Sequence, residues 1–152
     1  MALEMTGEYT LPLDRAAVYA ALNDSDMLKR CIPGCEQLDK LSDTEFSAVA
    51  RIEVGPVKAR FKGKVRLTDL DPPQAYRIVG EGEGGVAGFA KGNAAVTLEE
   101  VAGGTRLSYK AEAQVGGKLA QLGQRLLAGT AKKIADKFFA NFAAALMEQP
   151  RA

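Results

Sequence analysis

The chain has 152 residues and a mass of 16.1 kDa, which fits one domain of ordinary size. Its 20 Lys and Arg residues against 19 Asp and Glu residues give a net charge of +1, so we expect no nucleic-acid partner, because such binders are strongly basic. The sequence has no His, which excludes a Ser-His-Asp triad, a Cys-His pair and a three-His zinc site.

The only two cysteines, Cys31 and Cys35, are separated by three residues. With no further Cys or His to complete four ligands, they cannot form a structural zinc site, and we predict no metal. The geometry allows a disulfide between them, but the favoured interpretation is two free thiols without a redox role in a reducing compartment. The N-terminal run MALEMTGEYT carries Glu4 and Glu8 where a signal peptide needs a basic and then an apolar region, so we expect a cytoplasmic protein.

Residues 3–11 alternate apolar and polar side chains, which predicts a strand with one buried face. Asp14 is the expected N-cap of a short helix over residues 15–24. A second short helix is predicted from Ser25 to Arg30, ended by the Pro33-Gly34 pair. The start of the chain is therefore predicted to form one strand followed by two short helices.

Residues 36–115 are almost entirely strand pattern, interrupted by turn residues at Gly55-Pro56, Asp71-Pro72-Pro73 and Gly103-Gly104. Over residues 57–67 the apolar side chains alternate with basic ones, so all the charges share one face. Such alternation is typical of an antiparallel sheet with one solvated face. We predict a meander of about six strands here.

From Lys118 to Met147 the apolar residues recur at threes and fours, which is the stripe of an amphipathic helix. A helix of this length can lie along the whole sheet, although Gly123 and Gly129 each weaken it by about 1 kcal/mol or mark a bend. The predicted fold class is α+β: a curved antiparallel sheet of about seven strands wrapped around a long C-terminal helix, with two short helices after the first strand.

The inward positions of this sheet are occupied mainly by small residues. They include Ala48, Ala50, Ala59, Gly63, Gly80, Gly82, Ala94, Ala111 and Ala113. Alanine and glycine on a concave face do not reach close-packed density unless the sheet lies closer to the helix, which is the alternative. We therefore expect an apolar internal cavity.

The residues expected to line this cavity for a ligand come from the sheet and the long helix. They are Phe46, Ala48, Ile52, Phe61, Val65, Tyr76, Ile78, Phe89, Tyr109, Ala113, Leu122, Leu126 and Phe138. Phe89 is expected at the tip of a flexible glycine-rich loop, as a lid over the cavity mouth. A tyrosine hydroxyl is expected to hydrogen-bond a carbonyl group of the ligand.

Catalysis has little support in the sequence, because the assigned inward positions contain Tyr9, Tyr76 and Tyr109 but no carboxylate. We therefore name no catalytic residue and expect a binding protein rather than an enzyme. The glycine run GEGEGGVAGFAKG lacks the G-K-[ST] ending of a phosphate-binding loop, so nucleotide binding is disfavoured.

Four runs in chain order resemble the family of the CoxG subunit of carbon monoxide dehydrogenase. They are LNDSDMLKRCIPGCEQL, VGPVKARFKGKVRLTDLDPPQAYRIVGEG, GGVAGFAKGNA and VGGKLAQLGQRLL. The resemblance implies the START-like (SRPBCC) helix-grip fold over residues 1–149 as a single domain, with residues 150–152 as a tail. Other members have a longer C-terminus with a membrane-binding segment, whereas this chain stops at residue 152.

The resemblance also implies a hydrophobic-ligand pocket and a role beside molybdenum hydroxylases of the carbon monoxide dehydrogenase type. Family members have been linked to carrying a quinone and to recruiting the dehydrogenase to the membrane. The first functional hypothesis is therefore a carrier of an isoprenoid quinone or lipid, bound as a ligand and not as a cofactor.

Two other functional hypotheses stay open. One is a recruitment or assembly factor, and the other is a START-like enzyme acting on a lipid-like substrate. The alternating basic residues could dock an acidic protein or lipid headgroups, or be paired with glutamates on neighbouring strands. These residues are Lys58, Arg60, Lys62, Lys64 and Arg66. The basic excess of the long helix makes transient contact at the inner face of a membrane conceivable, though basic helices packed on their own sheet are commoner.

Overall fold

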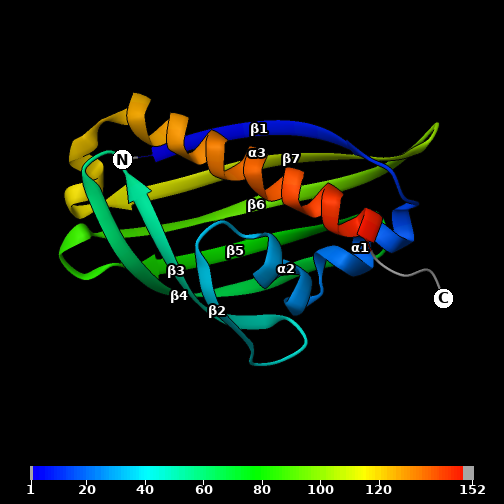
Figure 1. Ribbon diagram of the computed structural model, residues 1–152, viewed down its shortest axis with the longest axis horizontal. Coiled ribbons are helices and arrows are strands. Elements are labelled where there is room, and N and C mark those ends of the chain that lie inside the picture. Colours follow the sequence, from blue (N-terminus) through cyan, green and yellow to red (C-terminus); the bar gives the residue numbers. More distant parts are fainter. Residues whose placement is uncertain (1, 149–152) are drawn as a thin grey trace.

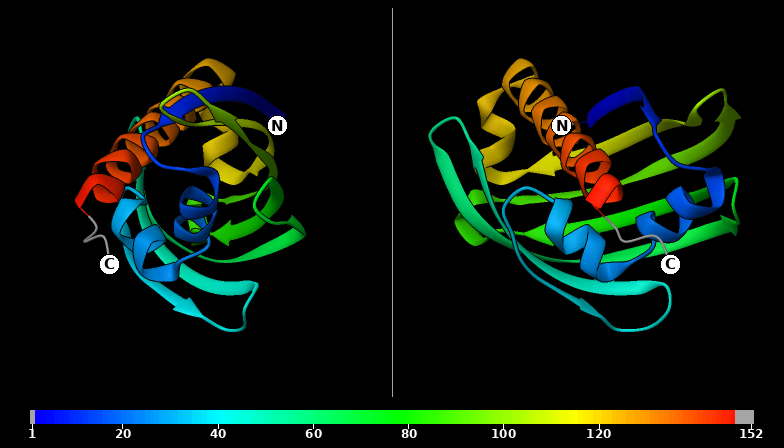
Figure 2. Two further views of the ribbon diagram at one scale, coloured as in Figure 1. Left: turned by 90° about the vertical axis from the view of Figure 1, so that its right-hand side faces the viewer. Right: turned by 45° about the vertical axis from the view of Figure 1, so that its right-hand side comes forward.

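Seven antiparallel strands form one sheet that curls around a long helix in the computed structural model, which describes residues 2–148 (Figures 1 and 2). The strands are β1 (Ala2–Leu11), β2 (Cys35–Lys40), β3 (Glu45–Val54), β4 (Val57–Asp71), β5 (Ala75–Glu83), β6 (Phe89–Val101) and β7 (Gly104–Gly116). Their order across the sheet is β1-β7-β6-β5-β4-β3-β2, so only β1 is displaced from a simple meander. The predicted α+β architecture is confirmed.

Two short helices, α1 (Arg15–Leu22) and α2 (Ser25–Cys31), join β1 to β2. The carboxylate of Asp14 accepts a hydrogen bond from the Ala17 amide at 2.8 Å, which is the predicted N-cap of α1. Asp24 caps α2 in the same way, through the Asp26 amide at 2.9 Å. Each helix directs apolar side chains into the core, and together they close one end of the curled sheet (Figure 1).

The C-terminal helix is shorter than the predicted helix from Lys118 to Met147. Residues Gly117–Leu122 form a 3-10 segment, η2, and the α-helix α3 runs from Gln124 to Glu148. Gly123 stands between them with a φ of +91°, a left-handed conformation that breaks a helix and that glycine adopts without steric cost. The prediction of one continuous helix was therefore wrong at its N-terminal end, and the bend at Gly123 is the alternative that the structure contains.

The connection between β5 and β6 is a short structured turn, not a flexible loop with an aromatic tip. It contains the 3-10 segment η1 (Gly85–Ala87), and the Gly84 amide donates to the Gly88 carbonyl at 2.8 Å. Ala87 is buried against the core. Phe89 already belongs to β6, where it pairs with Gly116, so the expected lid was wrong.

Two separate hydrophobic clusters fill the two ends of the space beneath α3. The larger cluster lies under α1, α2 and the C-terminal half of α3, and includes Leu11, Val18, Leu22, Phe46, Leu67, Tyr76, Leu107 and Phe142. The smaller cluster lies at the other end, around η1, η2 and the first turn of α3. It consists of Val54, Phe61, Ala87, Val115, Leu119 and Leu127. The core is thus divided along the axis of α3.

Two glycine substitutions are expected to change stability in opposite directions. A Cβ on Gly63 would lie 2.0 Å from the Glu81 carbonyl oxygen on the neighbouring strand, so Gly63→Ala should lower the free energy of unfolding by about 1–3 kcal/mol. A Cβ on Gly129 of α3 would meet no atom within 4 Å, so Gly129→Ala should raise it by about 1 kcal/mol. Urea unfolding followed by circular dichroism measures both. A stable Gly63→Ala variant would contradict the close approach of β4 and β5.

Candidate functional site: a band of small residues between sheet and helix

The strand register brings small residues side by side across the middle of the concave face. Gly92 on β6 pairs with Ala113 on one side and with Gly80 on the other. The full set, here called the small-residue band, is Ala48, Ala50, Gly63, Gly80, Gly82, Gly92, Ala94, Ala111 and Ala113. None of these residues belongs to either hydrophobic cluster. The band therefore separates the two parts of the core.

The part of α3 that lies over the band also has short side chains. Ala131 and Ala135 precede the fully buried Phe142 by about three and about two helical turns, so all three lie on one face of the helix. Both alanines are only half-buried, whereas Phe142 is fully buried. Alanines thus lie on this face of α3, beside larger side chains such as Phe138.

The residues of the band are not fully buried, and three of them, Gly80, Gly92 and Ala113, also line a groove on the outer side of the sheet. Every residue of the band is partly exposed, although the band crosses the inner strands of the sheet. A Cβ built on Gly80 would meet only the Lys64 carbonyl oxygen and the Val65 side chain, at 3.8 and 3.9 Å, and both belong to β4. No atom of α3 lies within 4 Å of that position. An open cavity beneath α3 therefore stays a prediction, and so does the alternative of a sheet packed more tightly against the helix.

Several residues predicted to line the ligand site border or belong to the band. Ala48 and Ala113 are part of it. Val65, Ile78 and Tyr109 are partly buried at its boundary with the larger cluster. Ile52 and Leu122 pack against the smaller cluster on the other side.

Other predicted lining residues are packed in the core. Phe46 and Tyr76 are 0% and 3% exposed within the larger cluster, and the Phe138 ring stacks on Phe142 with centroids 5.9 Å apart. The Phe61 ring covers Gly84 and is buried in the smaller cluster. These four residues pack in or against the two hydrophobic clusters on either side of the band. Phe46 and Tyr76 expose almost no surface that a ligand could contact.

Two predicted lining residues lie away from the band. Phe89 is 44% exposed and pairs with Glu83, on the face opposite to its inward neighbour Ala90. Leu126 is 39% exposed and contacts Gly55 at the β3–β4 turn. Strand alternation explains the first displacement, and in the second case it is the neighbouring Leu127 that is buried in the smaller cluster.

A polar contact between β1 and α3 was missed by the sequence analysis. The Tyr9 hydroxyl donates to Asp136 Oδ1 at 2.5 Å, and Lys132 Nζ donates to Asp136 Oδ2 at 2.9 Å. Burial, with a further contribution from the Asp136 hydrogen bond, raises the pKa of Tyr9 above its usual range. The hydrogen bonds from Tyr9 and Lys132 lower the pKa of Asp136. Only the Lys132–Asp136 spacing of four residues was visible in the sequence.

The outer face of the sheet carries the predicted basic residues and a groove of about 700 Å³. The register places Lys64 opposite Glu81, and Glu81 opposite Lys91, so opposite charges alternate across the strands. Backbone and side chains of β1 and β3 to β7 line the groove. They include Glu4, Glu45, Lys64, Arg66, Val79, Glu81, Lys91, Asn93, Glu112 and Gln114.

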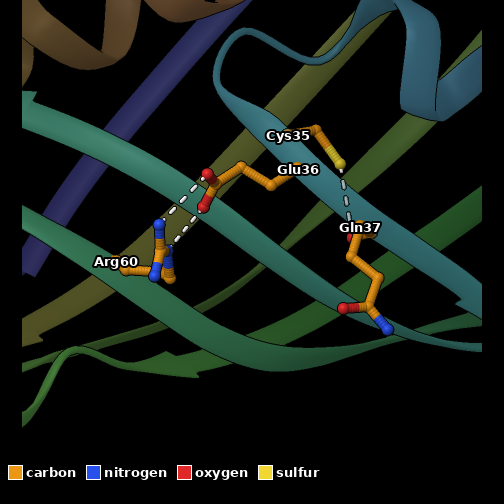
Figure 3. A network of polar contacts seen from close by, with 4 residues as sticks. All are labelled: Cys35, Glu36, Gln37 and Arg60. Atoms are coloured by element: carbon orange, nitrogen blue, oxygen red, sulfur yellow. Dashed lines mark hydrogen bonds and ion pairs between the residues drawn. The ribbon is translucent and has the colours of Figure 1, made fainter.

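Arg60 of the same basic row has its partner on β2. Its Nε and Nη2 atoms donate to the two carboxylate oxygens of Glu36 at 2.6 and 3.2 Å, as Figure 3 shows. This bidentate pair spans β3 and ties the edge strand to the sheet. A glutamate two strands away thus pairs with Arg60, and pairing of the basic row with glutamates on neighbouring strands stays a prediction.

The two cysteines contact different groups. Cys35 Sγ lies 3.5 Å from the Gln37 carbonyl oxygen (Figure 3), and Cys31 Sγ lies 3.7 Å from Met27 Sδ in the core. Burial raises the pKa of both thiols, which keeps them protonated and poorly nucleophilic at neutral pH.

Across residues 2–148 no group of His, Cys, Asp or Glu side chains is arranged to hold a metal ion. Within the same range no helix combines the length and apolarity that a membrane crossing requires.

Comparison with known proteins identifies the family and the fold. The family model for the CoxG subunit of carbon monoxide dehydrogenase matches residues 7–147. A conserved protein from Geobacillus kaustophilus is 31% identical, with 96% of each chain covered and a TM-score of 0.90. No curated protein matches the chain.

Two more distant solved structures share the fold. An aromatase/cyclase from a Streptomyces species is 12% identical, with 100% of this chain and 98% of that chain covered and a TM-score of 0.69. The protein Ara h 8.0201 is 14% identical, with 98% of this chain and 100% of that chain covered and a TM-score of 0.67. Both are of the helix-grip (SRPBCC) type, so the predicted helix-grip fold is confirmed.

Adding a large side chain should be tolerated in the band and not in the core. Ala113→Phe is expected to change the free energy of unfolding by less than about 1 kcal/mol, because its ring would enter the cavity predicted between sheet and helix. The matched variant Ala145→Phe places the same ring in the larger cluster, where Ala145 is buried, and should cost about 1–3 kcal/mol. Denaturant unfolding of both variants measures the difference, and equal losses would contradict an open band.

Proposed function

The chain belongs to the CoxG family of carbon monoxide dehydrogenase subunits, and from this membership we propose that it binds a hydrophobic small molecule between the small-residue band and α3. In this role it is an accessory protein and not an enzyme. The family's description as a subunit and the helix-grip fold both support a binding role. The reaction of the distant aromatase/cyclase relative is the main reason to keep an enzymatic alternative.

The single observation that carries the proposal is the partial exposure of the band. A sheet with seven strands and a covering helix would normally bury its central concave residues completely. Here those residues stay partly accessible, and the side chains of the band are only methyl groups or hydrogens. An apolar guest would remove this surface from water without displacing any large side chain.

The energetics favour a ligand with a long apolar tail. Burying about ten methylene groups contributes on the order of 8 kcal/mol before ordering costs, which is enough for micromolar affinity when those costs stay small. Val65, Ile78 and Leu122 would contact such a tail from the two borders of the band. An isoprenoid quinone has the required shape, and we propose it as the ligand.

The family description suggests the partner. We propose that the protein serves a carbon monoxide dehydrogenase of the molybdenum hydroxylase type, in the cytoplasm. Transient contact with the inner face of the membrane would involve the basic residues along η2 and α3. These are Lys118, Arg125, Lys132, Lys133 and Lys137.

A second candidate function is supported by the outer groove. The groove carries charges of both signs: Lys64, Arg66 and Lys91 alternate with Glu45 and Glu81, and Glu4 and Glu112 lie at the β1–β7 side. This charge pattern would orient a protein partner on the sheet. In this second role the protein recruits or assembles the dehydrogenase, and the interior is not involved.

Ligand binding is tested by native mass spectrometry after mild purification. The wild-type protein is expected to retain or take up one prenyl quinone, and Ala113→Phe is expected to lose it because the ring occupies the same space. Ala144→Phe, on the exposed face of α3, is the matched control and should bind as the wild type does. A wild-type protein that never takes up a prenyl quinone would refute the carrier function.

Docking through the groove is tested by charge reversal. The double variant Lys64→Glu, Arg66→Glu should abolish pull-down of the dehydrogenase while leaving quinone uptake unchanged, because both side chains lie on the outer face. Lys110→Glu reverses a charge on the same face of β7 outside the groove, and should have no effect. Loss of pull-down in Ala113→Phe instead would indicate that the dehydrogenase recognises the ligand-binding end.

A further inference from the structure

The turns at one end of the molecule form a single surface, which lies on the left in Figure 1. It consists of the β3–β4 turn, the η1 turn between β5 and β6, and η2 with the first turn of α3. A Cβ on Gly117 would lie 2.5 Å from the Cα of Gly88, so the backbones of η1 and η2 lie directly against each other. At the β3–β4 turn the Leu126 side chain contacts Gly55. The three segments are therefore joined, and we call them the glycine tip.

The glycine tip exposes large apolar side chains. Val86 in η1 is 84% exposed, which is more than any other large apolar residue that the structure describes. Phe89 at the start of β6 and Leu126 in the first turn of α3 are exposed as well. The turn that carries Val86 is anchored, because its neighbour Ala87 is buried in the smaller cluster. A valine held in water by an anchored turn gains free energy from any apolar medium that covers it.

Two cations on η2 and α3 accompany these apolar side chains. Lys118 directly follows Gly117, the residue through which η2 meets η1, and Arg125 directly precedes Leu126. Both cations are exposed, and in the part of the chain that the structure describes neither forms an ion pair. The glycine tip thus carries positive charge that can interact with an anionic surface.

The acidic residues nearest to the glycine tip do not cancel this charge. Glu53 lies opposite Lys58 in the register of β3 and β4, and Glu83 lies opposite Lys62 in that of β4 and β5. Each carboxylate therefore has a cation on the neighbouring strand. The two cations of η2 and α3 remain as excess charge.

The opposite end of the molecule also exposes apolar residues, but its charge pattern is different. Leu41 and Leu70 are exposed there, in turns that carry Asp43, Asp69 and Asp71. The cations of that end are held in ion pairs. These pairs are Arg15 with Glu100, Lys40 with Asp43, Arg77 with Asp69 and Arg106 with Glu99. An anionic surface is therefore attracted to the glycine tip and not to the opposite end.

We propose that the glycine tip docks end-on to a membrane with anionic lipids: Val86 enters the boundary between headgroups and acyl chains, and Lys118 and Arg125 contact the headgroups. An exposed apolar anchor beside unpaired cations is the combination that binds such an interface. The inference rests on the transient membrane contact proposed above and narrows it to one end of the molecule. Lys133 and Lys137, which begin roughly 12 Å further along α3, stay off the surface in this orientation. A second copy of the chain fits the tip less well, because two facing tips would bring like charges together.

Insertion of the tip is tested with a tryptophan reporter. Because the chain has no Trp, a single introduced Trp reports only on its own surroundings. The emission of Val86→Trp is expected to shift to shorter wavelength when vesicles of phosphatidylcholine and phosphatidylglycerol in equal amounts are added, since the indole enters a less polar medium. Vesicles of phosphatidylcholine alone should cause little shift. The matched Leu41→Trp variant, at the opposite end, should shift with neither kind of vesicle.

Sedimentation with the mixed vesicles measures how much each group contributes to binding. Val86→Asp should lower the partition coefficient of the full chain about tenfold, because the apolar anchor is lost. The double variant Lys118→Gln, Arg125→Gln should lower it about twentyfold, since each cation at an anionic surface contributes about fivefold. The matched double variant Lys133→Gln, Lys137→Gln removes the same charge from α3 and should lower it by less than about fivefold.

The outcomes separate this inference from the functions proposed above. If the wild-type protein binds neither kind of vesicle, the membrane contact and its orientation are both overturned, whereas quinone uptake is decided independently by native mass spectrometry. If the protein binds the mixed vesicles but Val86→Trp shows no shift, or if the α3 double variant loses as much binding as the tip double variant, end-on docking is overturned. A wild-type dimer in sedimentation equilibrium that Val86→Asp dissociates would overturn it too, because the tip would then be an interface between copies. Thermal unfolding of each variant shows whether lost binding follows from lost structure.

Discussion

The lack of side-chain volume across the middle of the concave face is the constraint on which the rest of the structure depends. Nine alanines and glycines occupy this part of the sheet, and the proposed ligand site lies between them and α3. Unfilled apolar space normally costs stability, roughly in proportion to its volume. The protein offsets this cost at the two ends, where large side chains form separate clusters.

This division of the core explains how α3 is held without being packed along its whole length. At its C-terminal end Asn141 Nδ2 donates to the Cys31 carbonyl oxygen at 3.0 Å, and Glu148 forms an ion pair with Arg30, so α3 is tied to α2. Near its middle the contact with Tyr9 fixes it to β1. Polar contacts and the two end clusters therefore hold α3 at its C-terminal end, near its middle and at its first turn.

The elements of the fold could be predicted largely from local patterns. Alternation predicted the strands, and the Asp14 cap and the apolar spacing predicted the short helices, because each depends on neighbours a few residues away. The errors came where a glycine decides between two conformations. Gly123 ends η2 instead of continuing a helix. The turn between β5 and β6 is so short that Phe89 is already the first residue of β6. Neither outcome is encoded in periodicity, because glycine is compatible with both.

The candidate site was predictable only in part. The sequence by itself determined that the concave face would be poor in side-chain volume, because strand alternation assigns each alanine and glycine to a face without reference to the rest of the chain. The tertiary structure alone decided that these residues lie between two separate hydrophobic clusters, and that Tyr9 meets Asp136 from 127 positions away. Such contacts depend on how the sheet curls and where the helix is anchored, and these follow from the packing of the whole chain, which no short pattern contains.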